Sequence, residues 1–447
     1  MTDRRARVLF AAVSVVALVA IVGLGLGMTF FSDEWAFIES RSLDDPSTWL
    51  PPHNEHWSTL PILLYRAMVE SIGIGSYVPY LVVVAVLHLS VAALVYTLLE
   101  RRTGPWLALA GGVIVLFFGS GFENLYWGFQ VGFVGSTVLG LAAMVVTDRG
   151  PSAGRAVTVA VLLLASLATS GTGIVMSIAI GVEWLLDARW RRWAPVLAVP
   201  AAGYIAWYVV FGRVGVTSRR DPFTLDALLD VPGFVVEGLG NAARSVTGLP
   251  IELAIAVAVI AIGWGVAQAR KGRLDPRAPA ILLAIVGQYA LTGLVRAQLF
   301  EGIVSYTRYT YVTGILLLVG TMTLIGSRQL PDRGSVRLVG VTAAATWLVL
   351  TLAFNVVLLV GGRELFLQRA DMTRALVTVA LDPDPPEGAQ LDRSLVLVPS
   401  ATSLQRIAAA YGDPRTDALT PWAVRPIPAD VLAEARRRLI EGAPIPR

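Results

Sequence analysis

The chain is built from long apolar runs separated by short polar segments. A helix needs about 20 mostly apolar residues to cross the hydrocarbon core of a bilayer. Eleven runs approach or reach that length, at residues 8–28, 76–99, 105–120, 128–147, 155–169, 171–187, 193–212, 251–269, 278–296, 303–326 and 336–360. The runs 155–169 and 171–187 are short, so we expect a hairpin of half-buried helices there. The pattern predicts an all-α polytopic membrane protein with about eleven transmembrane helices.

The composition supports this class. Of 447 residues, 55% are hydrophobic and 15% are charged, and the mean hydropathy is +0.65. A soluble domain carries about 25% charged residues. The absence of cysteine excludes disulfides and thiolate chemistry. The net charge of +4 comes from arginines in short loops between apolar runs, which is a topology signal. We therefore expect no nucleic-acid partner.

The arginine distribution also predicts an orientation. We expect the run from Val8 to Met28 to be a first membrane helix rather than a cleaved signal peptide. With a cytoplasmic N-terminus, nearly every short inner loop is rich in arginine, and the outer loops hold fewer. Eleven spans then place the C-terminus outside. The prediction is a multi-pass protein of the cell (plasma) membrane.

The composition changes after residue 360. This change divides the chain into a membrane module, 1–360, and an extracytoplasmic C-terminal segment, 361–447. Apolar residues at helical spacing predict a helix over 363–381, and "DPDPPEG" then breaks the chain. The stretch "SLVLVP", 394–399, predicts a short strand, followed by two helices. We expect a small α/β or irregular domain, or a cap over the membrane part.

Polar side chains gather in the predicted outer loops, beginning with "SDEW" directly after the first run. The structural interpretation is an interfacial helix, with Ser32 as N-cap and acids in its first turn. In the functional interpretation, Asp33 or Glu34 is a general base at the mouth of a membrane cavity. Two adjacent acids are also suited to a divalent cation.

The same loop contains "PPHNEHWSTLP", 51–61. His53 and His56 would share one face of a helix, and Asp33 with His56 is a candidate metal pair. Alternatively, Asn54, Glu55 and His56 form a substrate-binding loop, or the segment is merely solvated. We give less weight to His53 and Asp44. "WSTLPILLYRAM", 57–68, predicts an interfacial amphipathic helix.

Two further outer segments combine aromatic and polar residues. In "GFENLYWGFQ", aromatic rings beside acids and amides suit sugars, although an aromatic belt at the membrane surface explains them equally well. The candidates there are Glu123, Asn124, Trp127 and Gln130. In "SYTRYTY", Arg308 and Tyr309 lie near the start of a span. An arginine there binds a phosphate or extends to the lipid headgroups. Arg296 and "SRRD", 218–221, are weaker candidates.

The positions of these motifs give the chain a resemblance to the GT-C superfamily of membrane glycosyltransferases. "SDEW" stands in the place of that superfamily's acidic motif. "NEHW" and "ENLYWGFQ" look like stretches of bacterial members related to family 39 and to arabinosyl- or mannosyltransferases. The resemblance covers residues 8–360. It implies a polyprenyl-phosphate sugar donor, and a glycan, lipid or protein of the cell envelope as acceptor.

By position, the resemblance gives Asp33 the role of general base, with Glu34 assisting or binding a metal. Arg308 would hold the donor phosphate. Some relatives bind a divalent metal ion and others do not, so the metal stays open. Two alternatives also remain, a transporter or flippase of a lipid-linked or anionic substrate and a catalytically silent membrane partner. A transporter is expected to carry charges near the bilayer midplane. Such charges are scarce in these runs.

Overall fold

The computed structural model describes residues 2–213, 224–296, 307–326, 334–382, 391, 395–396, 398 and 400–441. These residues are mostly helical, and among them only two isolated β-bridges occur. Eight helical stretches of the described chain are long and apolar enough to cross a membrane. They contain α1 (Thr2–Gly25), α4 (Val78–Thr103), α7 (Val131–Thr147), α10 (Ala198–Trp207), α12 (Ile251–Arg270), α13 (Arg277–Arg296), α14 (Thr307–Gly326) and α15 (Gly334–Ala380). The prediction of an all-α polytopic membrane protein is confirmed.

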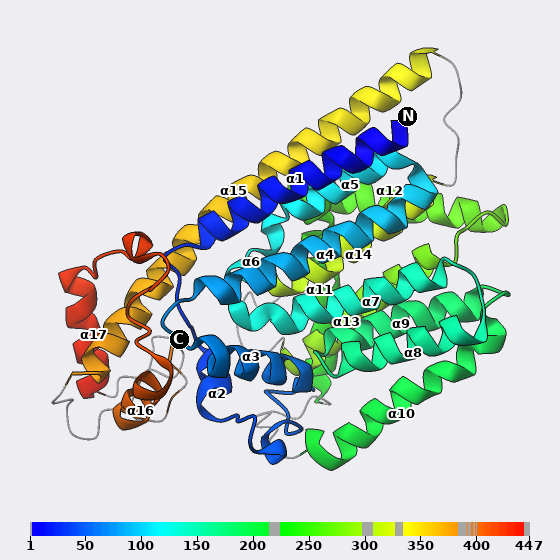
Figure 1. The fold of residues 1–447 in the computed structure, drawn as a ribbon. Helices are drawn as coiled ribbons and strands as arrows, with labels where there is room; N and C mark the ends of the chain where they lie inside the picture. Colours follow the sequence, from blue (N-terminus) through cyan, green and yellow to red (C-terminus); the bar gives the residue numbers. More distant parts are fainter. Residues whose placement is uncertain are drawn as a thin grey trace.

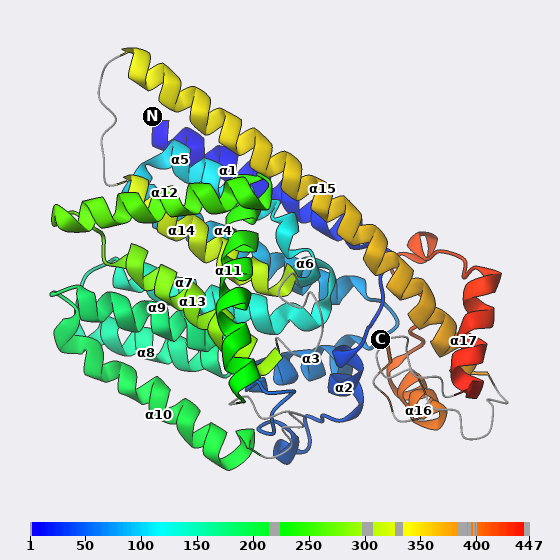
Figure 2. The same cartoon turned by 180° about the vertical axis from the view of Figure 1, so that it is seen from behind.

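Three shorter apolar helices complete the bundle: α5 (Pro105–Leu116), α8 (Ala153–Leu167) and α9 (Thr172–Leu186). α4 packs against α5 and α7, and α7 packs against α8 and α9. α13 lies between α9 and α14 (Figures 1 and 2). α8 and α9 follow each other in the chain and pack on each other and on α7, and α8 keeps one exposed face, in agreement with the expected hairpin of half-buried helices.

The predicted outer loop 213–250 contains a long helix that the hydropathy pattern does not mark as a span. This helix, α11 (Leu225–Thr247), is steeply inclined to its neighbours and packs against α13 and α14 (Figure 2). Its buried face consists mainly of small residues, including Gly238, Ala242 and Ser245. Small side chains allow close helix contact in membranes. "SRRD", 218–221, lies outside the described residues.

α15 is longer than the sequence pattern predicts. It runs without interruption through residue 360, where we expected one helix to end and a new unit to begin. Its 47 residues correspond to about 70 Å of helix, against about 30 Å of hydrocarbon in a bilayer. α15 therefore continues well beyond the membrane, beside α1 along one edge of the bundle (Figure 1).

Several short helices gather at one end of the bundle, which we call the α2 end. They include α2 (Asp33–Glu39), α3 (Thr59–Ile72), α6 (Glu123–Tyr126), α16 (Ala401–Tyr411) and α17 (Ala429–Glu441) (Figure 1). α3 matches the predicted interfacial helix. The predicted strand 394–399 lies partly outside the described residues, and Val396 there forms only an isolated parallel bridge with Ser32. The α2 end is the end predicted to face outside.

Candidate functional site

Asp33 is the first residue of α2, at the point where the chain leaves α1. Its Oδ1 lies 3.1 Å from Nε2 of His53. Burial by itself would raise the pKa of Asp33. The hydrogen bond and charge of His53, the charge of Arg308 and a hydrogen bond from Asn54 outweigh burial and hold the pKa below its ordinary value. Asp33 is therefore an ionised, oriented carboxylate at neutral pH.

His53 reaches Asp33 because residues 53–56 form a tight turn rather than a helix. The backbone N–H groups of His53 and His56 donate to each other's carbonyls, at 3.1 and 3.0 Å. Asn54 takes a left-handed conformation with φ 52°, which asparagine tolerates better than most residues. The sequence pattern favours other residues of this loop over His53, but His53 is the side chain that contacts Asp33.

The turn directs its other two side chains toward the helices of the bundle. Glu55 accepts a hydrogen bond from Nη2 of Arg296 at 2.6 Å, and Nη1 of Arg296 donates to the Tyr309 hydroxyl at 2.8 Å. Burial alone would raise the pKa of Glu55, but the charge of Arg296 keeps it below its ordinary value. Arg296, a weaker candidate from the sequence, thus joins Glu55 to Tyr309.

His56 faces away from Asp33. Its ring lies edge-on to Phe133 and directly against Gly171. Burial, with the positive charge of Arg296, lowers the pKa of His56 to about 4, so the ring is neutral at pH 7. The turn therefore separates the candidate metal pair Asp33 and His56. Among the residues that the structure describes, no three His, Asp or Glu side chains form a group suited to a metal ion.

Glu123 contacts the first residues of α14, which include Arg308. Its carboxylate accepts from the Thr307 hydroxyl and from the backbone N–H of Arg308, both at 3.1 Å. It thereby caps the N-terminus of α14, where a negative charge is favourable. The Arg308 guanidinium lies 5.4 Å from the centre of the Tyr309 ring and within electrostatic reach of Asp33. Residues 297–306 of the predicted outer segment lie outside the described residues.

The remaining candidates from "GFENLYWGFQ" are buried side chains. Trp127 packs against Phe31 and donates to its carbonyl at 3.2 Å. Asn124 donates to Gln130 at 3.4 Å, and the other amide atoms of both residues have no hydrogen-bond partner among the residues that the structure describes. The expectation that Trp127 offers an open face to a sugar is wrong, because the side chain is only 4% exposed.

Glu34 has a different environment from its neighbour Asp33. It is fully buried, and both oxygens accept hydrogen bonds, from the hydroxyls of Tyr65 and Tyr77 and from the backbone N–H of Phe31. Burial raises the pKa of Glu34 to about 8 against the effect of these donors. The structure thus separates the two acids of "SDEW", and Glu34 is not placed to assist Asp33 directly.

A mainly apolar cavity of about 210 Å³ adjoins the turn. Glu55, His56, Arg296 and Tyr309 form its polar edge, and the rest of its wall comes from α7, α9, α10 and α13. Asp33, Glu123 and Arg308 are not among its lining residues. The α2 end therefore combines an ionised carboxylate, two arginines and an apolar cavity on the membrane side of the turn.

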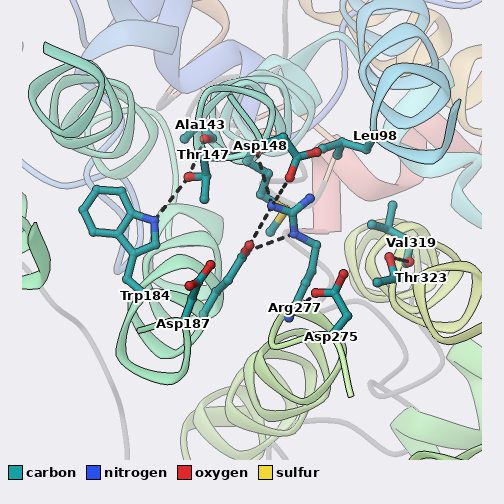
Figure 3. A network of polar contacts seen from close by, with 12 residues as sticks. Leu98, Ala143, Thr147, Asp148, Trp184, Asp187, Asp275, Arg277, Val319 and Thr323 are labelled. Carbon is teal, nitrogen blue, oxygen red and sulfur yellow. Dashed lines mark hydrogen bonds and ion pairs between the residues drawn. The ribbon is translucent and has the colours of Figure 1, made fainter. Parts of the chain in front are cut away.

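The opposite end of the bundle carries a second polar cluster, of which the sequence pattern indicates only the arginines of the inner loops. The Arg277 guanidinium is fully buried between Glu183 and Asp148, each 2.8 Å away (Figure 3). Arg102 from α4 binds the same Asp148 through both terminal nitrogens. A cavity of about 490 Å³ opens beside these residues. The paired charges lock α4, α7, α9 and α13 together, and none of them lies at the α2 end.

Comparison with known proteins finds distant structural similarity only. No protein-family profile and no curated protein sequence matches the chain. Among solved structures, ArnT from Cupriavidus metallidurans in the apo state has a TM-score of 0.48 and 14% identity, covering 95% of this chain and 90% of that one. The same ArnT bound to undecaprenyl phosphate has a TM-score of 0.46 and 14% identity, covering 94% and 89%.

An Archaeoglobus fulgidus oligosaccharyltransferase, tethered to an acceptor peptide, has a TM-score of 0.47 and 12% identity. The match covers 95% of this chain and 68% of that one. These similarities are too distant to assign a function, so the function is inferred from the residues of this chain.

Proposed function

We propose that the protein is a membrane glycosyltransferase that moves a sugar from a polyprenyl-phosphate donor to an acceptor outside the cytoplasm. The observation that carries the proposal is the ionised Asp33, bound by His53 and facing the charge of Arg308. Glu55 and His56 of the same turn line an apolar cavity that has Arg296 at its edge. A carboxylate base, a site for a phosphate and a site for a lipid chain are the three parts that such a transfer needs.

In this proposal Asp33 is the general base. The acceptor hydroxyl attacks the anomeric carbon of the sugar, the bond from that carbon to the phosphate oxygen breaks, and the phosphate leaves with the electron pair. The acceptor proton passes to Asp33 as the new bond forms. His53 and Asn54 hold the carboxylate in place, so that no reorganisation is needed during the transfer.

The leaving phosphate is stabilised by arginine. Arg308 and Arg296 flank Tyr309, and an arginine guanidinium is well matched to phosphate oxygens. The cavity beside His56 is mainly apolar, as a polyprenyl chain requires, since each buried methylene contributes about 0.8 kcal/mol. We propose Asn54, Glu55 and Tyr309 as substrate contacts, because Asn54 adjoins the Asp33 carboxylate and the other two adjoin Arg296.

The other candidates take supporting roles. Glu123 fixes the start of α14 and hence Arg308, while Glu34, Asn124, Trp127 and Gln130 are buried and support the surrounding structure. Asp33 contacts His53, whereas His56 packs against Phe133, so the candidate metal pair Asp33 and His56 is not brought together.

The test compares Asp33→Asn with Asp44→Asn, which changes an exposed acid of the same loop. Cells that lack the gene receive each variant, and mass spectrometry follows polyprenyl-phosphate-linked sugars and envelope glycoconjugates. We expect Asp33→Asn to lower transfer by about 10²- to 10⁴-fold, because the base is lost. The Asp44→Asn variant should transfer like the wild type.

Equal transfer by the two variants would contradict the proposal. The transporter alternative predicts a different result, namely flux of a lipid-linked substrate across vesicle membranes that does not depend on Asp33. Normal insertion of both variants is checked by their yield in the membrane fraction.

A further inference from the structure

The residues that lead into Asp33 are held by the far end of the chain. The Met28 carbonyl accepts from Arg374 at 2.9 Å, and the Thr29 hydroxyl donates to the Pro414 carbonyl at 3.3 Å. The Ser32 N–H donates to the Leu395 carbonyl at 2.8 Å. These contacts follow one another along residues 28–32, immediately before the carboxylate.

Ser32 shows that this support is needed. Its backbone has φ 50° and ψ −117°, a conformation that L-residues other than glycine rarely adopt, and its side chain makes no capping hydrogen bond to α2. Such a conformation persists only where the surrounding structure imposes it. Within α2, the Trp35 N–H donates to the Ser32 carbonyl at 3.1 Å. From the far end of the chain, Ser32 is held by its bond to Leu395, which belongs to the parallel bridge between Ser32 and Val396.

The other end of α2 is held through Arg66 of α3. Arg66 is almost fully buried, and its Nη1 donates to the Ile38 carbonyl at 2.7 Å, in the last turn of α2. Its Nη2 binds Glu70 and also donates to the Tyr411 hydroxyl at 2.9 Å. The Tyr411 ring lies against the same guanidinium, with 5.1 Å between the guanidinium carbon and the ring centre. Tyr411 is the last residue of α16.

We propose that the described residues between Leu391 and Ala423, here called the C-terminal cap, form a positioning element for Asp33. Leu395 holds the start of α2 and Tyr411, through Arg66, holds its end. This inference rests on the proposed function for its catalytic meaning, because Asp33 is the base only if the protein transfers a sugar.

The physical reason is the shortness of α2. Seven residues form too few internal hydrogen bonds to be stable alone, so the orientation of Asp33 depends on contacts at both helix ends. His53, Asn54 and Arg308 are the groups that face the Asp33 carboxylate. A small rotation of α2 therefore changes all three contacts at once.

The experiment uses the full chain in lipid nanodiscs and the variant Tyr411→Phe, which keeps the ring over Arg66 but removes the hydroxyl. Hydrogen–deuterium exchange measures the amides of α2, and difference infrared spectroscopy against Asp33→Asn measures the Asp33 carboxyl. The variant loses the bond from Arg66 and the longer bond that the hydroxyl donates to Glu70 at 3.3 Å. We expect about two- to tenfold faster exchange in α2 from loss of the bond to Arg66, and an upward shift of the Asp33 pKa. Tyr208→Phe, at an exposed tyrosine outside the cap, should change neither.

Thr29→Val gives a milder second test, since it removes the bond to Pro414 with little change of shape. It should shift both readouts in the same direction by a smaller amount. The proposal is overturned if α16 loosens in Tyr411→Phe while α2 exchange and the Asp33 pKa stay as in the wild type. Neither readout requires turnover, so a failed transferase assay with Asp33→Asn would refute the proposed function separately.

Discussion

The adjacent acids Asp33 and Glu34 have opposite protonation states at pH 7, because the pKa of Asp33 is lowered and that of Glu34 is raised to about 8. Asp33 faces cationic and amide groups, while Glu34 is enclosed by tyrosines and apolar residues. The sequence shows an acidic pair and places it correctly at a helix start, but it does not show which acid faces the site. That distinction depends on the 53–56 turn, whose geometry follows from a left-handed Asn54 that no pattern of apolar positions reveals.

The hydrogen bond from His53 should be visible in the pH dependence of transfer. His53→Phe keeps the ring contacts with Phe37 and Phe129 but removes the donor to Asp33. We expect kcat/KM to fall about ten- to hundredfold, as for loss of a hydrogen bond to a charged group. The acid limb of the profile should move to higher pH, because the Asp33 pKa rises when His53 is lost. An unshifted limb would contradict this role.

Glu34 should make the folded protein less stable at high pH. Its pKa in the folded state is about 8, above the ordinary 4.5, so folding favours the protonated carboxyl. The resulting stabilisation is complete below pH 4.5 and is lost as the pH rises through 8. The melting temperature in nanodiscs should therefore fall between about pH 5 and pH 9. Glu34→Gln, which cannot ionise, should remove that part of the fall.

At the scale of elements, the apolar runs predict most of the helices well. Their lengths and positions follow from the need to bury backbone polar groups in lipid, which leaves little freedom. The pattern misses α11, because its buried face consists of small residues rather than strongly apolar ones. It also divides α15 in two, because a change from apolar to amphipathic composition resembles a boundary although the helix continues.

α15 approaches the loop before α6 closely, and two adjacent glycines test this contact. A Cβ at Gly362 would lie 2.3 Å from the Phe122 ring, whereas one at Gly361 would meet nothing within 4 Å. We expect Gly362→Ala to destabilise the protein by about 1–3 kcal/mol through overpacking. Gly361→Ala should be neutral or stabilising by up to about 1 kcal/mol, since alanine favours helix. Thermal unfolding of both variants gives the comparison, and equal melting temperatures would refute the close contact.

At the scale of the whole molecule, the two ends of the bundle are built differently. The α2 end carries the candidate site on short helices and turns. At the opposite end, the buried ion pairs of Arg277 with Asp148 and Glu183 hold the helices together (Figure 3). Arginines and acids of the opposite end are visible in the sequence, but their pairing is not. Arg277, Glu183 and Asp148 come from three helices that only the fold brings together.

The network should contribute to stability and leave the chemistry at the α2 end untouched. Arg277→Met leaves Glu183 buried without its partner, which costs about 3–5 kcal/mol. Arg189→Met, at an exposed pair with Asp187, should cost at most about 1 kcal/mol. Thermal unfolding in nanodiscs measures both. If the two variants melt together, the buried network does not have the role we assign to it.

The contacts between the start of the chain and the C-terminal cap have a consequence for biosynthesis. Arg66 and Tyr411 are 345 residues apart, a distance that a ribosome covers in about 20 to 70 s. During that time the membrane helices are inserted one after another while α2 lacks its final partners. Premature termination near residue 390 would thus leave a chain that has inserted the membrane helices up to α15 but lacks the contacts that fix Asp33 in place.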